Sequence, residues 1–184
     1  MTKLYTRQGD DGLTGRLGSG RLPKNHPVIE ALGALDEATA ALGLARVSSQ
    51  DLRTREMILT VQRDLYRLMT EVSASEEVSD RFQKLDAAQV TWLEAQIDEL
   101  SRTVELPGEF IVPGDSPAGA LLAFTRAVVR KAERRVVDLF QEGELSNPAI
   151  LQYLNRLSSL LFVLELIENK AAGRTETTLA KTES

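Results

Sequence analysis

Three arginines at four-residue spacing are the most chemically suggestive feature of this sequence. Arg126, Arg130 and Arg134 share one stripe of a helix with about 3.6 residues per turn, and Glu133 lies beside them. Like charges in a row repel one another unless solvent disperses them, acids pair with them or a phosphate-rich ligand binds them. A solvated helix face is the ordinary explanation, and an anion site is the alternative that other segments favour.

The second candidate is a glycine-rich segment near the start of the chain. Residues 6–15 read TRQGDDGLTG, in which glycines let backbone amides approach a phosphate closely and Arg7 adds charge. The segment lacks the Gly-Lys-Ser/Thr ending of a P-loop, which argues against a P-loop nucleoside triphosphatase. Such segments are also often plain turns, although Arg21 and Lys24 add positive charge to this one.

Polar residues on two other helices ask for partners. Asp36 lies close to the apolar side of its helix, where a lone carboxylate is costly to bury, so an arginine of the arginine-rich helix could pair with it. That arginine could belong to the same chain or to a neighbour, and exposure of Asp36 to water is equally open. A polar strip in the last helix serves either hydrogen bonding between helices or a ligand. The strip consists of Asn155, Ser158, Ser159 and Phe162.

Composition excludes several classes of protein. The 184 residues, 42% of them hydrophobic, predict one domain over residues 1–173, of which 1–24 form an N-terminal loop region. The net charge of −5 argues against a nucleic-acid or membrane surface. No cysteine is present, His26 is the single histidine, and no segment approaches the roughly 20 apolar residues of a membrane span. A cytoplasmic protein is expected.

Hydrophobic periodicity indicates the elements that would position these residues. It predicts five helices, which begin near residues 27, 51, 86, 116 and 147. The first is expected to end near Arg46, the second near Val78 and the last near Gly173. Residues 7–24 are expected to form a loop, strand signals are too short for a sheet, and residues 174–184 are expected to be a disordered polar tail. The predicted fold is an all-α, five-helix up-and-down bundle.

A series of short motifs, taken in order, resembles the PduO-type ATP:cob(I)alamin adenosyltransferases. The motifs are TRQGDDG (6–12), GRLPK (20–24), GALDE (33–37), FIVPG (110–114), RAVVRKAER (126–134) and YLNRLS (153–158). The resemblance implies a five-helix bundle assembled as a homotrimer, with ATP, Mg²⁺ and a reduced corrinoid such as cobalamin at each subunit interface. It also implies an electron-donating reductase and an acceptor enzyme that depends on adenosylcobalamin.

The resemblance assigns roles residue by residue. On the phosphate side it implies an N-terminal loop made of Thr6, Arg7, Gly9, Asp10, Gly12, Thr14 and Lys24. It further implies that Arg126, Arg130, Glu133 and Arg134 bind ATP and the metal, with Glu133 as the metal ligand. Asp36 would form an intersubunit ion pair with Arg126, Phe110 would pack beneath the corrin ring, and Asn155 would lie toward the corrinoid.

The reaction that the resemblance implies needs no protein nucleophile, because cobalt(I) itself attacks the 5′ carbon of ATP. Several positions depart from the family pattern: Arg7 stands for a lysine, Asp115 for a glycine, Ala123 for a histidine and Ser159 for an acid. These changes favour, as an alternative, a non-catalytic ATP- or corrinoid-binding carrier or sensor on the same fold. A helical scaffold without a ligand is a third hypothesis.

Overall fold

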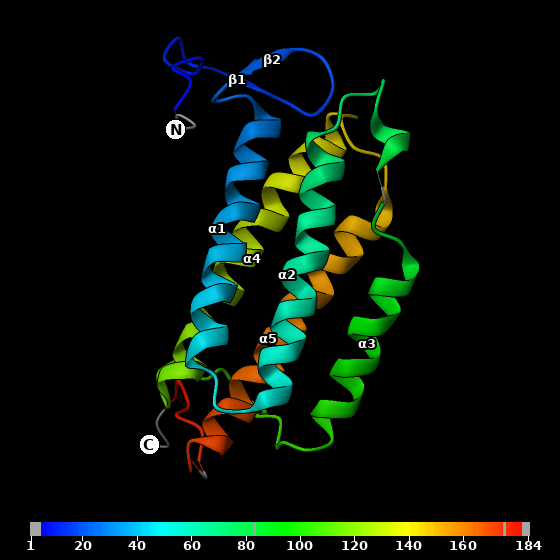
Figure 1. Cartoon of the computed structure of the whole chain (residues 1–184). Coiled ribbons are helices and arrows are strands. Elements are labelled where there is room, and N and C mark those ends of the chain that lie inside the picture. Colours follow the sequence, from blue (N-terminus) through cyan, green and yellow to red (C-terminus); the bar gives the residue numbers. More distant parts are fainter. Residues whose placement is uncertain (1–4, 83, 175, 182–184) are drawn as a thin grey trace.

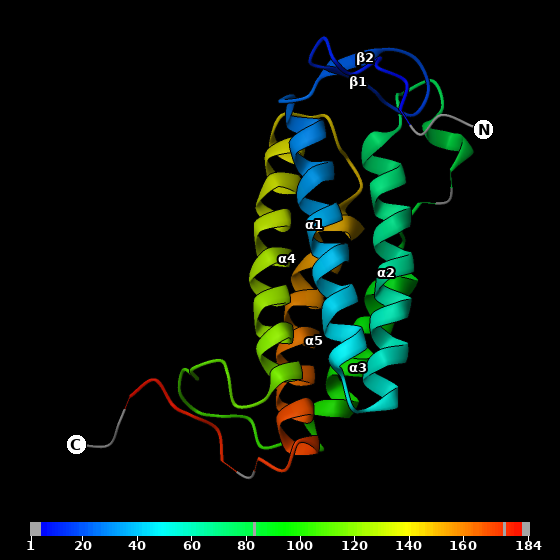
Figure 2. The same ribbon diagram turned by 60° about the vertical axis from the view of Figure 1, so that its left-hand side comes forward.

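The chain folds into a bundle whose helices run alternately up and down (Figures 1 and 2). The computed structural model describes residues 5–82, 84–174 and 176–181. Within that part there are five α-helices: α1 (Pro27–Ser48), α2 (Leu52–Ser73), α3 (Ala87–Ser101), α4 (Pro117–Gln141) and α5 (Pro148–Ala171). A short 3-10 helix, η1 (Ser79–Arg81), lies between α2 and α3. The predicted all-α bundle is confirmed.

The helices begin where the sequence places cap residues. The imidazole Nδ1 of His26 accepts a hydrogen bond from the Val28 amide at 3.3 Å, directly before Pro27 at the first position of α1. Asp86 and Gln89 form the predicted capping box of α3. Prolines also open α4 and α5, since their fixed φ suits the first helical turn and their missing N–H costs nothing there.

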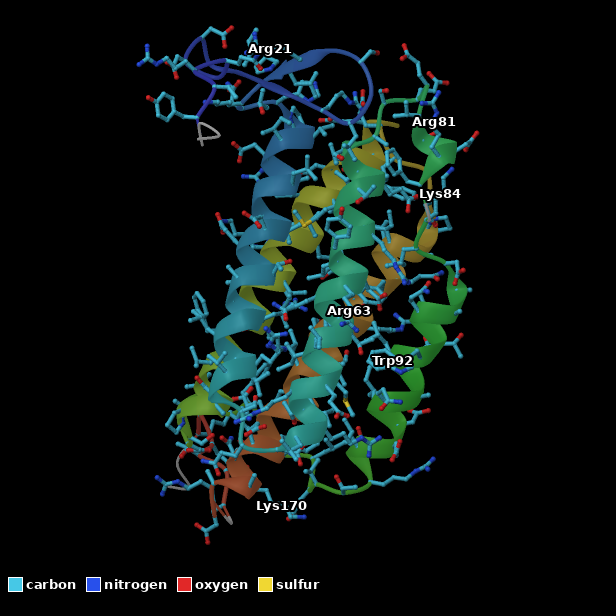
Figure 3. All side chains as sticks on the ribbon, in the orientation of Figure 1. Arg21, Arg63, Arg81, Lys84, Trp92 and Lys170 are labelled. Atoms are coloured by element: carbon cyan, nitrogen blue, oxygen red, sulfur yellow. The ribbon has the colours of Figure 1, made fainter. Side chains whose placement is uncertain are left out.

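The core forms where α1 packs against α4 and α4 packs against α5. The buried face of α1 is rich in alanine, and small side chains let two helix axes approach closely. These alanines are Ala31, Ala34, Ala38, Ala41 and Ala45. Larger side chains fill the layers between the other helices, and Trp92 on α3 packs half-buried against this core (Figure 3). Each fully buried leucine stabilises the fold by about 1.5–3 kcal/mol.

Helix α2 ends at Ser73, so the prediction that it reaches Val78 was wrong. The Arg16 guanidinium donates to the carbonyls of Ser73 and Ala74, at 3.3 and 2.7 Å, and the Ser75 amide donates to the Leu17 carbonyl at 2.8 Å. These groups are therefore engaged by the N-terminal segment and do not continue the helix. Periodicity within α2 cannot reveal a competitor that lies so far away in sequence.

The N-terminal segment contains a small hairpin that the sequence prediction of a plain loop missed. Strand β1 (Leu13–Gly15) pairs antiparallel with β2 (Arg21–Pro23), and Thr14 lies opposite Leu22. Gly18 and Gly20 in the connection have φ values of 97° and 93°, a region that side chains with a Cβ rarely occupy. The hairpin lies across the end of the bundle where α1 begins (Figure 1).

The described part of the C-terminal segment makes defined contacts, unlike the disordered tail expected from its composition. The Val112 amide donates to the Thr178 carbonyl and the Ala180 amide to the Phe110 carbonyl, both at 2.8 Å. The Thr178 hydroxyl donates to Asp115 Oδ1 at 2.6 Å. Residues 176–181 thus lie along the segment that precedes α4, at the end of the bundle opposite the hairpin (Figure 2).

Helix α5 is long and apolar enough to satisfy the length and hydropathy criteria for a membrane span, which the sequence analysis did not anticipate. It has 24 residues, and its most apolar 18-residue window has a mean hydropathy of 1.4. Because 61% of that window is buried among the other helices, the apolar composition is that of the central helix of a bundle. Glu165, Glu168 and Asn169 on the same helix are also buried inside the protein.

Candidate functional site

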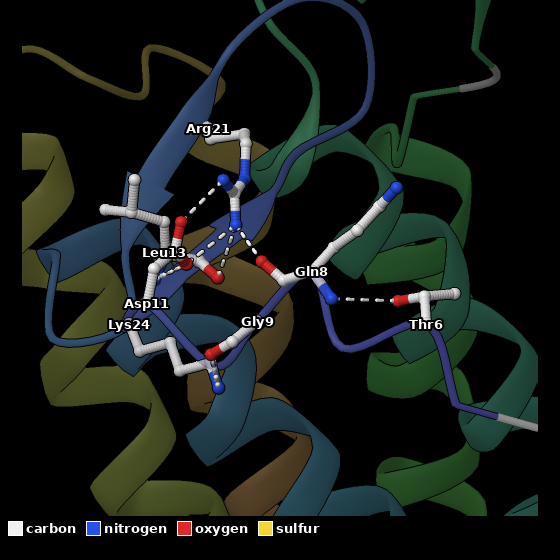
Figure 4. A network of polar contacts seen from close by, with 7 residues as sticks. All are labelled: Thr6, Gln8, Gly9, Asp11, Leu13, Arg21 and Lys24. Carbon is white, nitrogen blue, oxygen red and sulfur yellow. Dashed lines mark hydrogen bonds and ion pairs between the residues drawn. The ribbon is translucent and has the colours of Figure 1, made fainter.

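A network of polar contacts shapes the N-terminal loop (Figure 4). The Arg21 guanidinium forms two hydrogen bonds with the Asp11 carboxylate, at 2.8 and 2.9 Å, and also donates to the Gln8 carbonyl. The Lys24 ammonium donates to the Gly9 carbonyl at 2.8 Å, which closes the loop. Hydrogen bonding from Arg21 holds the pKa of Asp11 below its ordinary value.

The predicted phosphate-binding residues lie along this exposed loop. Gly9 and Thr14 are half-buried, and the others are exposed: Thr6, Arg7, Asp10, Gly12 and Lys24. Arg7 has a φ of 61°, and its guanidinium carbon lies 5.6 Å from the centroid of the Tyr5 ring. Sequence reasoning noted the charge of Arg21 but missed its pairing with Asp11. The signal was present, because turn-forming glycines bring these two residues together.

The arginine stripe of α4 divides into an outer and an inner part. Arg130 and Arg134 are exposed, and Arg134 Nη1 donates back to the Arg130 carbonyl at 3.0 Å. Arg126 is half-buried, and its guanidinium carbon lies 5.7 Å from the centroid of the Phe162 ring on α5. The outer two arginines therefore offer free donors to an anion, whereas the inner one is held against the bundle.

Glu133 and Asn155 meet where α4 packs against α5. Asn155 Nδ2 donates to Glu133 Oε1 at 3.2 Å, and Arg156 Nη1 donates to Asn155 Oδ1 at 2.9 Å. The bond from Asn155 engages Oε1 of Glu133 and leaves Oε2 for another partner. The polar strip predicted on α5 is thus partly internal, since the Ser158 hydroxyl donates to the Asn155 carbonyl at 2.9 Å.

The donor set suits a magnesium ion that arrives with a nucleotide. Magnesium keeps several waters and binds through one or two carboxylates together with substrate phosphates. Glu133 supplies one such carboxylate beside the exposed arginines. Among the described residues there is no group of three or more acidic or histidine side chains that could hold a metal alone. The residues therefore fit a shared site and not a prebuilt cage.

Asp36 is exposed, and no ion pair joins it to Arg126 within the described chain. Its neighbour Glu37 instead pairs with Lys131 of α4 at 2.8 Å, with both side chains about half-exposed. The described chain by itself therefore does not form the ion pair between Asp36 and Arg126, which the resemblance implies between subunits.

Buried Glu165 is a functional candidate that sequence reasoning missed. It is 2% exposed on α5, and burial raises its pKa to about 7, although Arg126 opposes this and Asp115 adds to it. The signal was an acid between two leucines within the apolar run FVLELI (162–167), which periodicity alone places on the buried face.

The single chain does not gather all predicted site residues. Phe110 is 88% exposed in the segment before α4, at the end of the bundle opposite the N-terminal hairpin (Figures 1 and 2). Two hollows of the described part lie elsewhere: one is lined by Leu17, Arg63, Tyr66 and Phe82, and another by residues 104–109 together with Gly173 and Arg174. None of the predicted site residues lines these hollows, so one copy by itself does not enclose the predicted ligands.

Comparison with known proteins places this geometry in a family. Residues 4–168 match the family model described as cobalamin adenosyltransferase. The corrinoid adenosyltransferase PduO of Salmonella typhimurium is 36% identical over 170 residues, which cover 92% of this chain and 50% of that protein. The corrinoid adenosyltransferase of Bacillus subtilis is 36% identical over 177 residues, covering 93% and 89%. The chain thus spans about half the length of the PduO relatives and most of the shorter one.

Solved structures agree with the sequence comparison. An alanine-for-phenylalanine variant of a PduO-type ATP:corrinoid adenosyltransferase from Lactobacillus reuteri, complexed with cobalamin and ATP, superposes with a TM-score of 0.88. It is 26% identical, and the match covers 98% of this chain and all of that one. A lysine-for-arginine variant from the same organism, complexed with ATP, also gives 0.88 at 27% identity, over 97% and 100%. The chain therefore belongs to the cobalamin adenosyltransferase family.

Proposed function

We propose that this protein is an ATP-dependent corrinoid adenosyltransferase, which transfers the 5′-deoxyadenosyl group of ATP to the cobalt of cob(I)alamin or a related reduced corrinoid. The observation that carries the proposal is the exposed pair Arg130 and Arg134 beside Glu133, in a family with a structural neighbour that was solved with cobalamin and ATP. Relatives named corrinoid adenosyltransferases support the same activity.

The chemistry asks little covalent work of the protein. The electron pair of cobalt(I) forms a cobalt–carbon bond at the 5′ carbon, the bond from that carbon to oxygen breaks, and triphosphate leaves with the electron pair. The protein must align the two substrates and neutralise the charge on the leaving group. Exposed arginines suit this task because guanidinium groups bind phosphate oxygens in a bidentate manner.

On the phosphate side, we assign the N-terminal loop and the outer face of α4 to ATP. Arg7 and Lys24 supply charge on the loop, and Arg130 and Arg134 supply donors from the helix. Magnesium bound through Glu133 would neutralise part of the triphosphate charge. Asn155 restrains Glu133 through its hydrogen bond, which keeps the carboxylate oriented.

On the corrinoid side, we assign Phe110 to the face of the corrin ring and Asn155 to its neighbourhood. Phe110 is exposed enough to meet a large planar ligand. Asp115, which departs from the family pattern, engages its carboxylate with Thr178 through bonds at 2.6 and 3.0 Å. These bonds offset part of the negative charge that the substitution adds near the ring.

A homotrimer is part of the proposal, because the loop and Phe110 lie at opposite ends of one bundle and neither ligand is enclosed by a single chain. In the trimer, Asp36 of one copy would pair with Arg126 of the next. A cytoplasmic location, an electron-donating reductase and an acceptor enzyme for the product belong to the same proposal.

An anaerobic assay of the purified protein with MgATP and chemically reduced cob(I)alamin tests the activity. The visible spectrum reports the cobalt–carbon product, and free triphosphate should appear in equal amount. Arg130→Ala should abolish most of the product. Arg135→Ala is the matched control, because Arg135 is exposed on the same helix and pairs only loosely with Asp138, at 3.7 Å.

One result would overturn the enzyme, and another would overturn the role given to Arg130. A wild-type protein that binds ATP but forms no product would favour the carrier or sensor. Equal losses in Arg130→Ala and Arg135→Ala would show that the stripe acts only through general charge and not through a defined phosphate contact.

A further inference from the structure

Two buried polar atoms without partners lie on facing helices near the inner end of the arginine stripe. Oε1 of Glu165 on α5 and Nε of Arg126 on α4 are both buried, and neither has a hydrogen-bond partner within the described chain. A buried donor or acceptor left without a partner costs about 1–3 kcal/mol, so such atoms are uncommon unless something satisfies them. A carboxylate oxygen and a guanidinium N–H are chemically complementary.

The surroundings of Glu165 define its charge balance. Within the described chain, the charged groups that act on it are Arg126 of α4, which attracts the carboxylate, and Asp115 before α4, which repels it. Burial adds a further penalty for the ionised form, and together these effects raise the pKa of Glu165 to about 7. The carboxylate therefore changes charge near neutral pH.

We propose that Glu165 is a positioning residue for Arg126: its carboxylate is the intrachain counter-charge that holds the inner edge of the guanidinium. This deepens the proposed function, on which it rests, because Arg126 is assigned to the subunit interface.

The geometry of arginine explains how one side chain can serve both sides. A guanidinium has five N–H donors, and here Nε is buried while the residue as a whole is only half-buried. Nε faces the protein interior, and the Phe162 ring supports the guanidinium from α5. In the proposed pairing, Nε donates toward the Glu165 carboxylate, and the outer N–H groups remain for an acid of a second copy.

The adenosylation rate of Glu165→Gln as a function of pH is the first test. Glutamine has the shape of the protonated acid, so kcat/KM of wild type and variant should agree near pH 6 and differ by about tenfold near pH 8.5, where the carboxylate is ionised. A residue with a merely structural role would change the ratio equally at both pH values. Glu165→Asp, which keeps the charge, should retain the pH dependence.

Thermal unfolding tests the buried titration of Glu165, on which the pairing acts, without any activity. Because the pKa of Glu165 is raised in the folded state, its stabilising contribution is full below the ordinary value of 4.5 and is lost as the pH rises through about 7. Glutamine cannot ionise, so the Tm of Glu165→Gln minus that of wild type should grow by about 3 °C or more between pH 5.5 and 8.5. Glu142→Gln, which removes a charge from an exposed position, should show no such growth.

A double variant tests whether Arg126 is the partner. In an Arg126→Gln background, Glu165 loses its attracting charge, so its folded-state pKa should rise further. The stability loss should then extend to higher pH, and the Tm difference should be larger at pH 8.5. An unchanged Tm difference in that background would overturn the pairing, as would a rate ratio that is constant with pH. If the wild type makes no product, the proposed function fails while the thermal measurements still decide the pairing. Glu165→Leu serves the thermal test if the glutamine variant folds poorly.

Discussion

The acids on the inside of the bundle and the arginines on the outer face of α4 are used in opposite ways. Buried Glu168 accepts hydrogen bonds from the amides of Gln50 and Asp51, at 2.8 and 3.3 Å. These bonds hold the turn between α1 and α2 against the bundle. Arg130 is exposed, and within the described residues no ion pair engages its guanidinium. The buried acid is used to hold the backbone in place, whereas the charge on this outer face remains available for a ligand.

Arg130→Ala is the strongest way to probe the outer face. Removal of one preorganised donor to a developing negative charge should lower kcat by about 100- to 1,000-fold, since such groups act mainly in the transition state. The Tm should change by no more than about 2 °C, because the side chain is exposed. Steady-state kinetics and a melting curve on the same preparation make the measurement. A large fall in Tm would show that Arg130 stabilises the fold, as the buried acids do.

Glu168→Ala should give the opposite result. Two partly buried backbone amides would lose their acceptor, which predicts a loss of about 3 kcal/mol in the free energy of unfolding. Denaturant titration measures this loss, and Glu168→Gln, which keeps one acceptor oxygen, should recover part of it. If the activity per folded molecule also falls, the contrast between the buried acids and the exposed arginines does not hold.

Tyr153→Phe tests a smaller contribution from the interior. The hydroxyl donates to Asp64 Oδ2 at 3.1 Å, and burial raises the pKa of both groups. Loss of this donor should cost about 1–2 kcal/mol, because the phenyl ring still fills the space while a buried carboxylate loses a partner. Chemical denaturation at pH 7 checks the value. No loss would indicate that water replaces the hydroxyl.

Asp11→Asn should have the smallest effect on stability. The pair with Arg21 lies in an exposed loop, where solvent screens the attraction. The Tm should therefore stay within about 1 °C of wild type, while the affinity for MgATP changes severalfold as the loop loses its shape. Calorimetric titration with MgATP measures the affinity. A clear fall in Tm would show that the pair of Asp11 and Arg21 stabilises the fold, as the buried groups do.

Particular residues show what local sequence could predict. Caps and prolines at Pro27, Pro117 and Pro148 placed the helix starts correctly, since capping depends on neighbouring residues only. The end of α2 could not be predicted, because Arg16 and Leu17 compete for its backbone groups from another part of the chain. The hairpin was missed because its strands are only three residues long.

By itself, the sequence determined the helical class, the helix starts and the amphipathic faces, since these follow from periodicity and capping over a few residues. It also carried the motifs that the family shares. Only the tertiary structure decided which charges are free: it buried Glu165 beside Arg126, joined Asn155 to Glu133 and left Arg130 exposed. The physical reason is that burial and pairing depend on residues brought together from distant parts of the chain, and the environment they create sets the charge of each group.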